Sequence, residues 1–522
     1  MKSSINSKKT VLRAFGVISS MTFLSRITGY IRDAFIAAFI GATYFSDAFF
    51  VAFRIPNLFR RLLGEGALTP AVVPVVTELL GKDEKEANDG IKSIIAASGL
   101  LVFFITVLGI ILSPVIVKLL AYGFTKNELI YTLTVNLNRL MFPYLFFISI
   151  VAVYMGILNA KHHFFAPSFS PVLLNLSMIF SLIFLRFFVK LPVFALAYGV
   201  LLGGLAQLIF QIPYLKKENL PFIPSRRLKT EATVAVFKLL IPSIFGLAIT
   251  QINILVDTLV ASFLKSGTVS YLYYADRLLE LPIGIFVISF ATAILPVISK
   301  NVIDEDVEGV NKNFSKTLTY CLFFIIPSMF FLVSLGKPTI SILFKRKAFD
   351  MEALQGTYLA LIGYTLGLPF FTFNRLITPI FYAYKNTKLP VRAGFFAMIT
   401  NIIFDILLMP FGAFGLSVAT SLSSVTNSFF LYKYFKQFHH PLEFEKSKTV
   451  AIKLFFSCLF ASFPILLLSV YFAYDDNIFI KLLYLIVLTA LYLCFMAIFL
   501  ILFKTEEVKE LWEFIQKRFL KQ

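Results

Sequence analysis

The chain has 522 residues, of which 58% are hydrophobic and only 15% are charged, and 62 residues are phenylalanine. In soluble domains about a quarter of all residues are charged, so this composition excludes an ordinary soluble protein. Apolar segments of about 20 residues, the length that crosses a bilayer as a helix, recur along the whole sequence. A membrane β-barrel would show shorter segments of alternating polarity. The sequence therefore predicts an all-α polytopic membrane protein.

Hydropathy predicts about 14 transmembrane helices. In chain order these cover residues 11–41, 45–80, 90–120, 128–158, 165–188, 192–215, 231–264, 268–300, 314–343, 352–384, 390–410, 414–438, 449–473 and 477–503. The long first segment carries charges and lacks a small-residue cleavage site, so we expect it to be retained rather than removed as a signal peptide. Cys321, Cys458 and Cys494 lie far apart in apolar segments, which predicts buried free thiols rather than disulfides or a metal site.

Loop charge predicts the orientation. An even number of spans puts both termini on one side of the membrane. The loops and ends on that side hold roughly thirty Lys and Arg, against about seven on the other, and cytoplasmic loops are the basic ones. We therefore expect both termini in the cytoplasm, and we interpret the net charge of +19 as a topology signal rather than a sign of nucleic-acid binding. The tail beyond Phe503 reads either as an amphipathic surface helix anchored by Trp512, Phe514 and Phe519 or as a solvated tail.

An internal repeat divides the chain. "DAFIAAFI" at 33–40 is echoed by "DTLVASFL" at 257–264, and "VVPVVTELL" at 72–80 by "ILPVISKNV" at 294–302. The offset spans six helices, so both copies enter the membrane in the same direction, related by a pseudo-twofold axis along the membrane normal. We predict two six-helix lobes, residues 1–220 and 221–440. Residues 441–522 then hold two extra helices and the C-terminal tail.

Charged side chains interrupt the apolar helices. Helices 1, 2 and 8 contain five arginines of interest, namely Arg26, Arg32, Arg54, Arg60 and Arg277. Ionised groups at this depth face protein or water, and arginine grips phosphate through forked hydrogen bonds. This pattern favours a cationic cavity for a large anionic substrate. The alternative is structural pairing, since Arg61–Glu65 and Arg277–Glu280 have helical i,i+4 and i,i+3 spacing.

A second group of polar residues suits a cation. Asn401 and Asp405 share one face of helix 11, Asp257 lies on helix 7, and Ser417 and Ser421 share one face of helix 12. Oxygen-only ligation suits a hard cation such as Na⁺, which commonly drives secondary transport. A protonatable carboxylate with hydrogen-bonded neighbours is the alternative interpretation.

Catalytic motifs are missing from the sequence. It contains no GxxxxGK[ST] phosphate loop, no HExxH and no GxSxG. We therefore expect a secondary transporter rather than an enzyme, with no cofactor other than a coupling Na⁺.

Three long stretches resemble one family. "SSMTFLSRITGYIRDAFIAAFIGATYFSDAFFVAFRIPNLFRRLLGEGALTPAVVPV" is similar to the opening of the MurJ (MviN) family of bacterial lipid II flippases, within the MOP exporter superfamily. "SGTVSYLYYADRLLELPIGIF" resembles the family's eighth helix and "SPVLLNLSMI" its fifth. The resemblance covers essentially the whole chain. It implies a multi-pass protein of the bacterial inner membrane whose central cavity alternates between inward- and outward-open states.

The resemblance also implies a substrate and site residues. Lipid II, an undecaprenyl-diphosphate glycopeptide, would cross to the outer leaflet for peptidoglycan synthesis, with its tail in a groove partly formed by helices 13 and 14. The family's cavity arginines match Arg26, Arg32, Arg60 and Arg277. Its important acidic and polar positions match Ser25, Asp33, Asp47, Asn57, Glu65, Ser270 and Asp276. Some members carry a sodium site, whose ligands match Asp257, Asn401 and Asp405, with Ser417 and Ser421 as further matches.

The partners expected are lipid II, membrane lipids and the cell-wall synthesis machinery, around a monomer that binds no nucleic acid. A MOP flippase for another polyprenyl-diphosphate-linked glycan is the main alternative. A drug-cation exporter conflicts with the cationic cavity, and an enzyme acting on polyprenyl phosphates would need clustered aspartates for Mg²⁺. A scaffold whose charges are only structural pairs is the remaining alternative.

Overall fold

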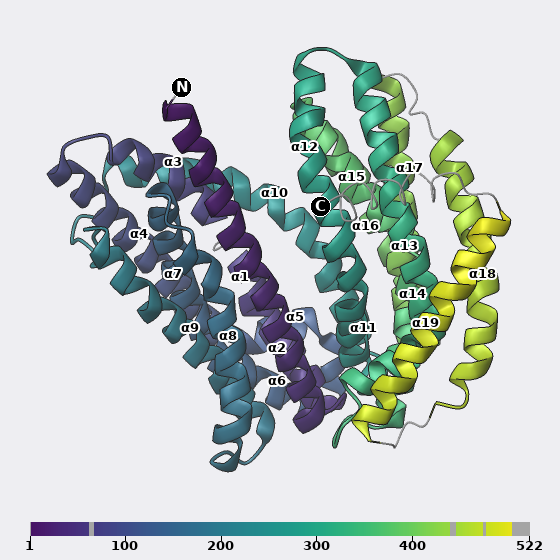
Figure 1. Cartoon of the computed structure of the whole chain (residues 1–522). Coiled ribbons are helices and arrows are strands. Elements are labelled where there is room, and N and C mark those ends of the chain that lie inside the picture. Colours follow the sequence, from purple (N-terminus) through teal and green to yellow (C-terminus); the bar gives the residue numbers. More distant parts are fainter. Residues whose placement is uncertain (1, 62–66, 439–444, 473–476, 504–522) are drawn as a thin grey trace. The chain divides into compact units, whose positions relative to one another are not determined.

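The computed structural model describes residues 2–61, 67–438, 445–472 and 477–503, and the regular structure in these ranges is entirely helical (Figure 1). The α-helices are α1 (Lys2–Ile40), α2 (Tyr44–Phe59), α3 (Thr69–Leu79), α4 (Glu84–Ile111), α5 (Ser113–Leu120), α6 (Glu128–Met141), α7 (Pro143–Ala160), α8 (Phe165–Phe184), α9 (Pro192–Lys217), α10 (Glu231–Ala261), α11 (Thr268–Pro282), α12 (Ile288–Ile303), α13 (Val307–Leu343), α14 (Met351–Thr365), α15 (Leu368–Ala383), α16 (Lys388–Leu408), α17 (Gly412–Phe438), α18 (Glu445–Ser469) and α19 (Ile478–Leu502). Short 3₁₀ turns η2 (Tyr122–Lys126), η3 (Leu185–Phe187) and η5 (Met409–Phe411) and a π-helical turn η4 (Ile283–Val287) join some of them.

Each predicted segment corresponds to one helix or to a broken helix. The second, third, fourth, eighth and tenth segments are the pairs α2 and α3, α4 and α5, α6 and α7, α11 and α12, and α14 and α15. Proline lies in the first turn of α5, α7 and α15, as Pro114, Pro143 and Pro369. Proline cannot continue a helical hydrogen-bond ladder but is favoured in the first turn, so these residues mark where a new helix begins.

The length and hydropathy of the described helices support a polytopic membrane protein. Nine helical segments are long and apolar enough to cross a membrane, or ten when α14 and α15, bent by 50°, count as one span. Residues 388–436 of α16 and α17 form one of these segments, and none of them includes α1, α2, α3, α5 or α10. The helix α1 carries Arg26, Arg32 and Asp33, and α2 and α3 are each too short. The prediction of an all-α polytopic membrane protein is confirmed.

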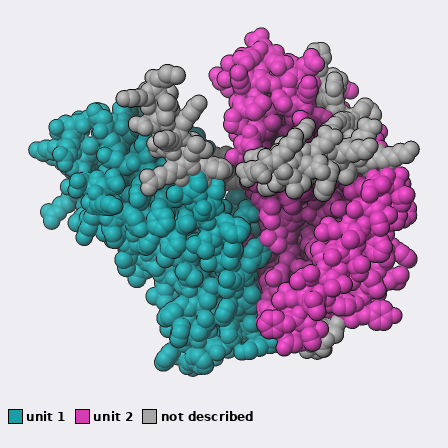
Figure 2. Space-filling model, viewed as in Figure 1, with its two compact units in different colours: residues 1–269, 347–349 teal, residues 270–346, 350–522 magenta. Residues whose placement is uncertain are grey.

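The chain divides into two compact units, which Figure 2 distinguishes by colour. Unit 1 contains residues 1–269 and 347–349, and unit 2 contains residues 270–346 and 350–522. The helix α10 therefore belongs to unit 1, where the Ser93 Oγ of α4 lies 2.8 Å from the Thr233 Oγ1 of α10. The sequence repeat assigns the same helix to the second lobe, so the lobes at residues 1–220 and 221–440 stay a prediction.

In unit 1, the helix α8 packs against both α1 and α9. Glycines allow the close approach to α9, because a Cβ on Gly199 would lie 2.8 Å from the Met178 Cα atom. Small residues are the usual means of close helix packing in membranes, where lipid is as apolar as leucine. On the side towards α1, Gly29 lies opposite the Asn175 side chain. This packing places a polar residue of α8 beside the charged stretch of α1.

In unit 2, the long helix α13 packs against α14, α15, α18 and α19, and α17 packs against α14, α15 and α16. The Tyr492 hydroxyl of α19 donates to the Pro327 carbonyl of α13 at 2.9 Å. That carbonyl lies in the apolar, membrane-spanning part of α13, where a hydrogen bond is stronger than in water. The bond therefore fixes α19, the last described helix, to α13.

The three cysteines are free thiols, as predicted. Cys321 and Cys458 are buried, but Cys494 is exposed, so its predicted burial is wrong. It lies on α19, whose most apolar window is only 17% buried in the protein. An apolar neighbourhood in a membrane sequence can mean contact with lipid as well as with protein.

Candidate functional site

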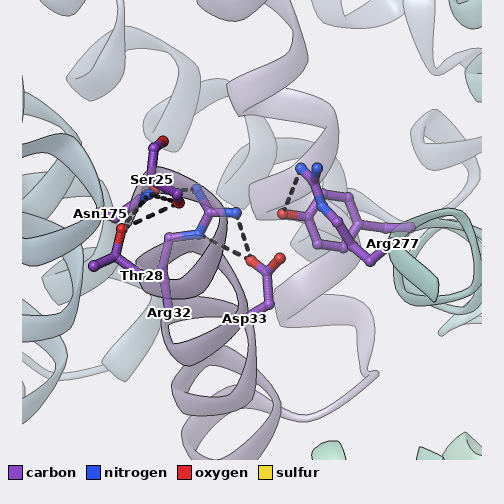
Figure 3. Close-up of polar contacts among 7 residues, drawn as sticks. Ser25, Thr28, Arg32, Asp33, Asn175 and Arg277 are labelled. Atoms are coloured by element: carbon purple, nitrogen blue, oxygen red, sulfur yellow. Dashed lines mark hydrogen bonds and ion pairs between the residues drawn. The ribbon is translucent and has the colours of Figure 1, made fainter. Parts of the chain in front are cut away.

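Arg32 and Asp33 of α1 form the centre of a buried polar network with Asn175 of α8 (Figure 3). The Arg32 Nε and Nη2 atoms donate to Asp33 Oδ1 at 2.9 and 2.6 Å, and Nη1 donates to Asn175 Oδ1 at 2.8 Å. Arg32 is 9% exposed and Asp33 only 1%. A buried ion pair persists only when geometry and extra hydrogen bonds offset desolvation, and here the amide supplies that bond. The network fixes the direction of the guanidinium.

Asn175 is itself oriented by α1. Its Nδ2 donates to the Ser25 carbonyl at 3.0 Å and to the Thr28 Oγ1 at 3.1 Å, which leaves its Oδ1 facing Arg32 (Figure 3). The predicted residue Ser25 thus takes part through its backbone. Sequence reasoning did not select Asn175, although an amide inside an apolar helix is a signal for an interhelical contact.

Arg26 lies half-buried on the same helix. Within the described part of the chain, no hydrogen bond or ion pair engages its guanidinium, in contrast to Arg32. An arginine of this kind keeps its donors for water or a ligand.

At the end of α2, Arg60, the residue that follows the helix, donates from Nε to Asn57 Oδ1 at 2.9 Å. Buried Asp47 lies in the first turn of α2, where a carboxylate complements the helix dipole, and it accepts a hydrogen bond from the Gly267 backbone N–H. Glu65, and with it the Arg61–Glu65 pair, falls outside the described residues. The Asp47 contact links α2 to the chain segment that follows α10.

Arg54, expected among the cavity arginines, contacts α10. Its Nη1 donates to the Thr258 hydroxyl and to the Ile254 carbonyl, the latter at 3.3 Å. A guanidinium that satisfies a backbone carbonyl of a neighbouring helix serves packing. The structure therefore assigns Arg54 a contact that the sequence did not predict.

Arg277 of α11 in unit 2 is supported differently. Its Nη2 donates to the Tyr273 hydroxyl at 3.1 Å, and its guanidinium lies 4.8 Å from the centre of the Tyr273 ring (Figure 3). The alternative of an Arg277–Glu280 pair is wrong, because Glu280 Oε1 accepts from Arg375 Nη2 of α15 at 2.9 Å. An i,i+3 pair is weak, and the approach of α15 gives the carboxylate a better partner. Of the other predicted positions on α11, Ser270 is buried and Asp276 is exposed.

The candidate cation ligands fall in both units. In unit 2, Asn401 Nδ2 donates to Asp405 Oδ2 at 2.7 Å, and both side chains are buried. The Ser417 hydroxyl donates to the Phe414 carbonyl and the Ser421 hydroxyl to the Gly363 carbonyl. Asp257 lies on α10 in unit 1. These oxygen atoms fit a hard cation chemically, whereas no cluster of three or more His, Cys, Asp or Glu occurs among the described residues.

Unit 2 also contains an apolar groove with a volume of about 880 Å³. Its walls come from α13, α15, α17 and α18, with Leu366 beside α14. Phe370, Phe373, Phe429, Phe455 and Phe456 dominate its lining. Ser428, Tyr432, Ser447 and Lys448 are its polar members. The thirteenth helix, α18, lines this groove, and no described residue of the fourteenth, α19, does so. The lipid-tail groove expected from helices 13 and 14 stays a prediction.

Broken apolar helices, membrane-embedded arginines held by polar neighbours and an apolar groove define a polytopic membrane transporter rather than an enzyme. A solved structure titled as the lipid II flippase MurJ in an inward closed conformation matches with a TM-score of 0.76 and 29% identity, covering 92% of this chain and 98% of that one. An inward-facing multidrug-resistance MATE transporter of the MOP superfamily shares the fold at a TM-score of 0.66 and 15% identity.

Sequence comparison identifies the family. The family model described as lipid II flippase MurJ matches residues 36–486. The "Probable lipid II flippase MurJ" of Vibrio cholerae is 38% identical over 434 residues, covering 81% of this chain and 83% of that protein. The "Lipid II flippase MurJ" of Burkholderia cenocepacia is 33% identical, covering 81% and 83%. The chain belongs to the MurJ family of flippases, and the predicted resemblance is confirmed.

Proposed function

We propose that this protein moves lipid II from the cytoplasmic to the outer leaflet of a bacterial inner membrane by alternating access, for peptidoglycan synthesis. The observation that carries the proposal is the Arg32–Asp33–Asn175 network, a fixed guanidinium inside a membrane helix bundle. Relatives above 30% identity over most of their length are named lipid II flippases, which supports this substrate. Both termini lie in the cytoplasm in this proposal, in agreement with the loop charges.

The diphosphate is the part of the substrate that the arginines bind. A diphosphate cannot enter a membrane without compensation of its charge, and arginine offers planar paired N–H donors for phosphate oxygens. Asp33 and Asn175 hold the Arg32 side chain before substrate arrives, so little conformational entropy is lost on binding. Arg26, Arg60 and Arg277 supply further positive charge in this proposal.

The polyprenyl tail occupies the apolar groove of unit 2. An isoprenoid chain is hydrophobic and flexible, and the aromatic lining gives it contact without hydrogen-bond requirements. The polar group of Ser447 and Lys448 at the groove wall would limit how far an apolar chain extends.

A sodium ion coupled to transport would use Asp405, Asn401 and Asp257, with Ser417 and Ser421 as further oxygen donors. The buried carboxylate of Asp405 beside an amide suits either Na⁺ or a proton. A sodium-dependent transport rate that Asp405→Asn and Asp257→Asn abolish would support Na⁺. A rate that depends on pH but not on Na⁺ would support the proton.

The deciding experiment measures lipid II translocation in proteoliposomes, with and without Na⁺ and a membrane potential. Wild type should translocate lipid II, and Arg26→Ala, Arg32→Ala and Arg277→Ala should each lose most of the rate at equal protein levels. Full activity in all three variants would contradict the binding model. Faster transport of another polyprenyl-diphosphate-linked glycan than of lipid II would favour a flippase for that substrate instead.

A further inference from the structure

We propose that Arg186 and Lys347 of unit 1 bind the phosphate of an anionic phospholipid, such as phosphatidylglycerol, in the outer leaflet of the membrane. One acyl chain of this lipid lies along an exposed apolar strip of α8 that ends beside Arg186. The residues concerned all belong to unit 1. The inference goes beyond the proposed function and takes from it only the orientation of the chain.

The basic residues on the expected outer side are concentrated in two loops. Loops on the non-cytoplasmic side of a membrane protein usually hold few Lys and Arg. Residues 186–190 and 345–347 nevertheless contain five of them. The rule that sets membrane orientation does not explain this concentration of positive charge. A ligand that carries negative charge does.

The ring of Phe39, near the end of α1, brings the two loops together. The Arg186 guanidinium of η3 lies 4.1 Å from the centre of this ring, and the Lys347 ammonium lies 5.0 Å from it. Arg186 also lies 4.5 Å from the centre of the Phe187 ring. Each cation–π contact is favourable, but two positive charges at one ring repel each other. A phosphate bound by both cations removes that repulsion and offers acceptors to the guanidinium.

The backbone holds Lys347 in this place. The Ala348 N–H donates to the Ala38 carbonyl of α1 at 3.2 Å. Gly41 permits this approach, because a Cβ there would overlap the Ala348 carbonyl oxygen. Lys347 has a φ of 47°, a left-handed conformation that costs free energy in a residue other than glycine and persists where the surroundings enforce it. Its neighbour Arg346 instead donates to carbonyls in the last turn of α13.

The nearest carboxylate in the sequence has another role. Asp350 is the only acidic residue within three positions of Arg186 or Lys347. It caps α14 by accepting from the Ala353 N–H at 2.8 Å. Within the described ranges, neither cation forms an ion pair with a carboxylate, and the buried Arg186 Nε has no hydrogen-bond partner. Arg186 therefore keeps donors for a ligand.

An apolar strip on α8 fits an acyl chain. Spacings of four, four and three residues place its members on one face of the helix, and they are Leu176, Phe180, Phe184 and Phe187. Each is between 46% and 73% exposed, and the rings of Phe180 and Phe184 lie 4.6 Å apart. The strip is about 16 Å long, roughly half of a hydrocarbon core of about 30 Å. It matches the depth of one leaflet, which favours a lipid over a free phosphate ion.

The first test titrates the full-length protein in detergent with phosphatidylglycerol or with phosphatidylcholine and measures bound lipid by native mass spectrometry. Wild type should bind phosphatidylglycerol at least about tenfold more tightly. Arg186→Gln and Lys347→Gln should each weaken that binding about fivefold, and the double variant about 25-fold. Equal binding of the two lipids by wild type would overturn the inference, as would unchanged phosphatidylglycerol binding in the double variant.

Lys126 provides a matched control. It lies 5.5 Å from the centre of the Phe263 ring in the same unit, in another loop of the expected outer side. Lys126→Gln should leave phosphatidylglycerol binding unchanged. A loss as large as that of Lys347→Gln would mean that any positive charge on this side attracts the lipid, and the assignment of a site to Arg186 and Lys347 would be wrong.

The strip is tested by the length of the acyl chain. Phe180 lies about two turns below Arg186, beyond the reach of a six-carbon chain. Phe180→Ala should weaken binding of dioleoyl-phosphatidylglycerol about threefold and leave binding of dihexanoyl-phosphatidylglycerol unchanged. An equal loss for both lipids, or no loss for either, would contradict the placement of the acyl chain on α8.

Undecaprenyl diphosphate separates this site from the proposed substrate site. Its binding should be lost in Arg277→Ala and kept in Arg186→Gln/Lys347→Gln. Loss in the latter variant, with no preference for phosphatidylglycerol in wild type, would overturn the phospholipid assignment in favour of a second substrate site. Binding that survives Arg277→Ala would contradict the diphosphate model of the proposed function and leave this inference intact.

The outer-leaflet placement has its own test. Lys190 is exposed in the same loop as Arg186. Lys190→Cys in spheroplasts should react with a membrane-impermeant maleimide before lysis, at a level above that of the protein without this change. Labelling that appears only after lysis would overturn the placement in the outer leaflet.

Discussion

Arg32 and Arg277 illustrate two ways of keeping an arginine inside a membrane protein. Arg32 is buried and bound to a carboxylate and an amide, whereas Arg277 is half-buried and held by a tyrosine. The first arrangement offsets the desolvation of the charge and makes the fold depend on it. The second holds the side chain through a tyrosine ring and hydroxyl, which carry no charge of their own. Two arginines that the sequence assigns the same role therefore differ in what their removal should cost.

The largest expected effect is on stability, from Arg32→Gln. This change removes the Arg32 guanidinium from its ion pair with Asp33, which is almost fully buried. Breaking one partner of a buried ion pair costs about 3–5 kcal/mol, so the free energy of unfolding should fall by that amount. Titration of the reconstituted protein with SDS measures it. A loss below about 1 kcal/mol would mean that the Arg32–Asp33 pair contributes little to stability. The fold would then depend on Arg32 no more than on Arg277.

The second effect concerns Asn175. Asn175→Leu removes the acceptor for Arg32 Nη1 and the donor to the Ser25 carbonyl. Unfolding should become easier by about 1–3 kcal/mol, the usual cost of leaving buried polar groups without their partner. Asn374→Leu is a suitable control, since Asn374 makes comparable interhelical bonds to Ser424 of α17 in unit 2. Lipid II binding should fall with Asn175→Leu and not with the control.

The third test separates the two roles of Arg32. In Arg32→Gln/Asp33→Asn both charges are removed, and buried pairs replaced as a whole are often nearly neutral for stability. The double variant should recover most of the unfolding free energy, to within about 1 kcal/mol of wild type, yet remain inactive in lipid II translocation. Recovery of transport together with stability would show that Arg32 acts only as a structural pair.

The sequence predicts the class of fold and the position of the charged stretches, because membrane spans and intramembrane charges follow from composition alone. It does not predict which residues form ion pairs and hydrogen bonds with one another. Glu280 has suitable spacing for Arg277, yet it pairs with Arg375 of α15, and Arg54 donates to the Ile254 carbonyl of α10. Such contacts depend on helix packing over long sequence separations, which periodicity within one helix does not encode.

Asn175 shows the same limit from the opposite direction. Asn175 lies in a stretch that resembles the family, but its contact with Arg32 requires that α8 approach α1 at Gly29. Exposure of Cys494 is a further case, because hydropathy cannot distinguish a helix face that meets lipid from one that meets protein. The sequence predicts where the polar and charged residues lie along the chain. The tertiary contacts determine which residues they bind.

The smallest expected change in stability comes from Arg277→Gln. The Tyr273 contacts contribute about 0.5–1 kcal/mol at a partly exposed site, so the free energy of unfolding should fall less than in Arg32→Gln, which breaks a buried ion pair. Binding of undecaprenyl diphosphate should nevertheless fall at least about tenfold, because a charge facing the ligand is lost. SDS titration and calorimetry on the same preparation measure the two quantities. A stability loss equal to that of Arg32→Gln would place Arg277 among the structural charges, and the contrast between the two arginines would not hold.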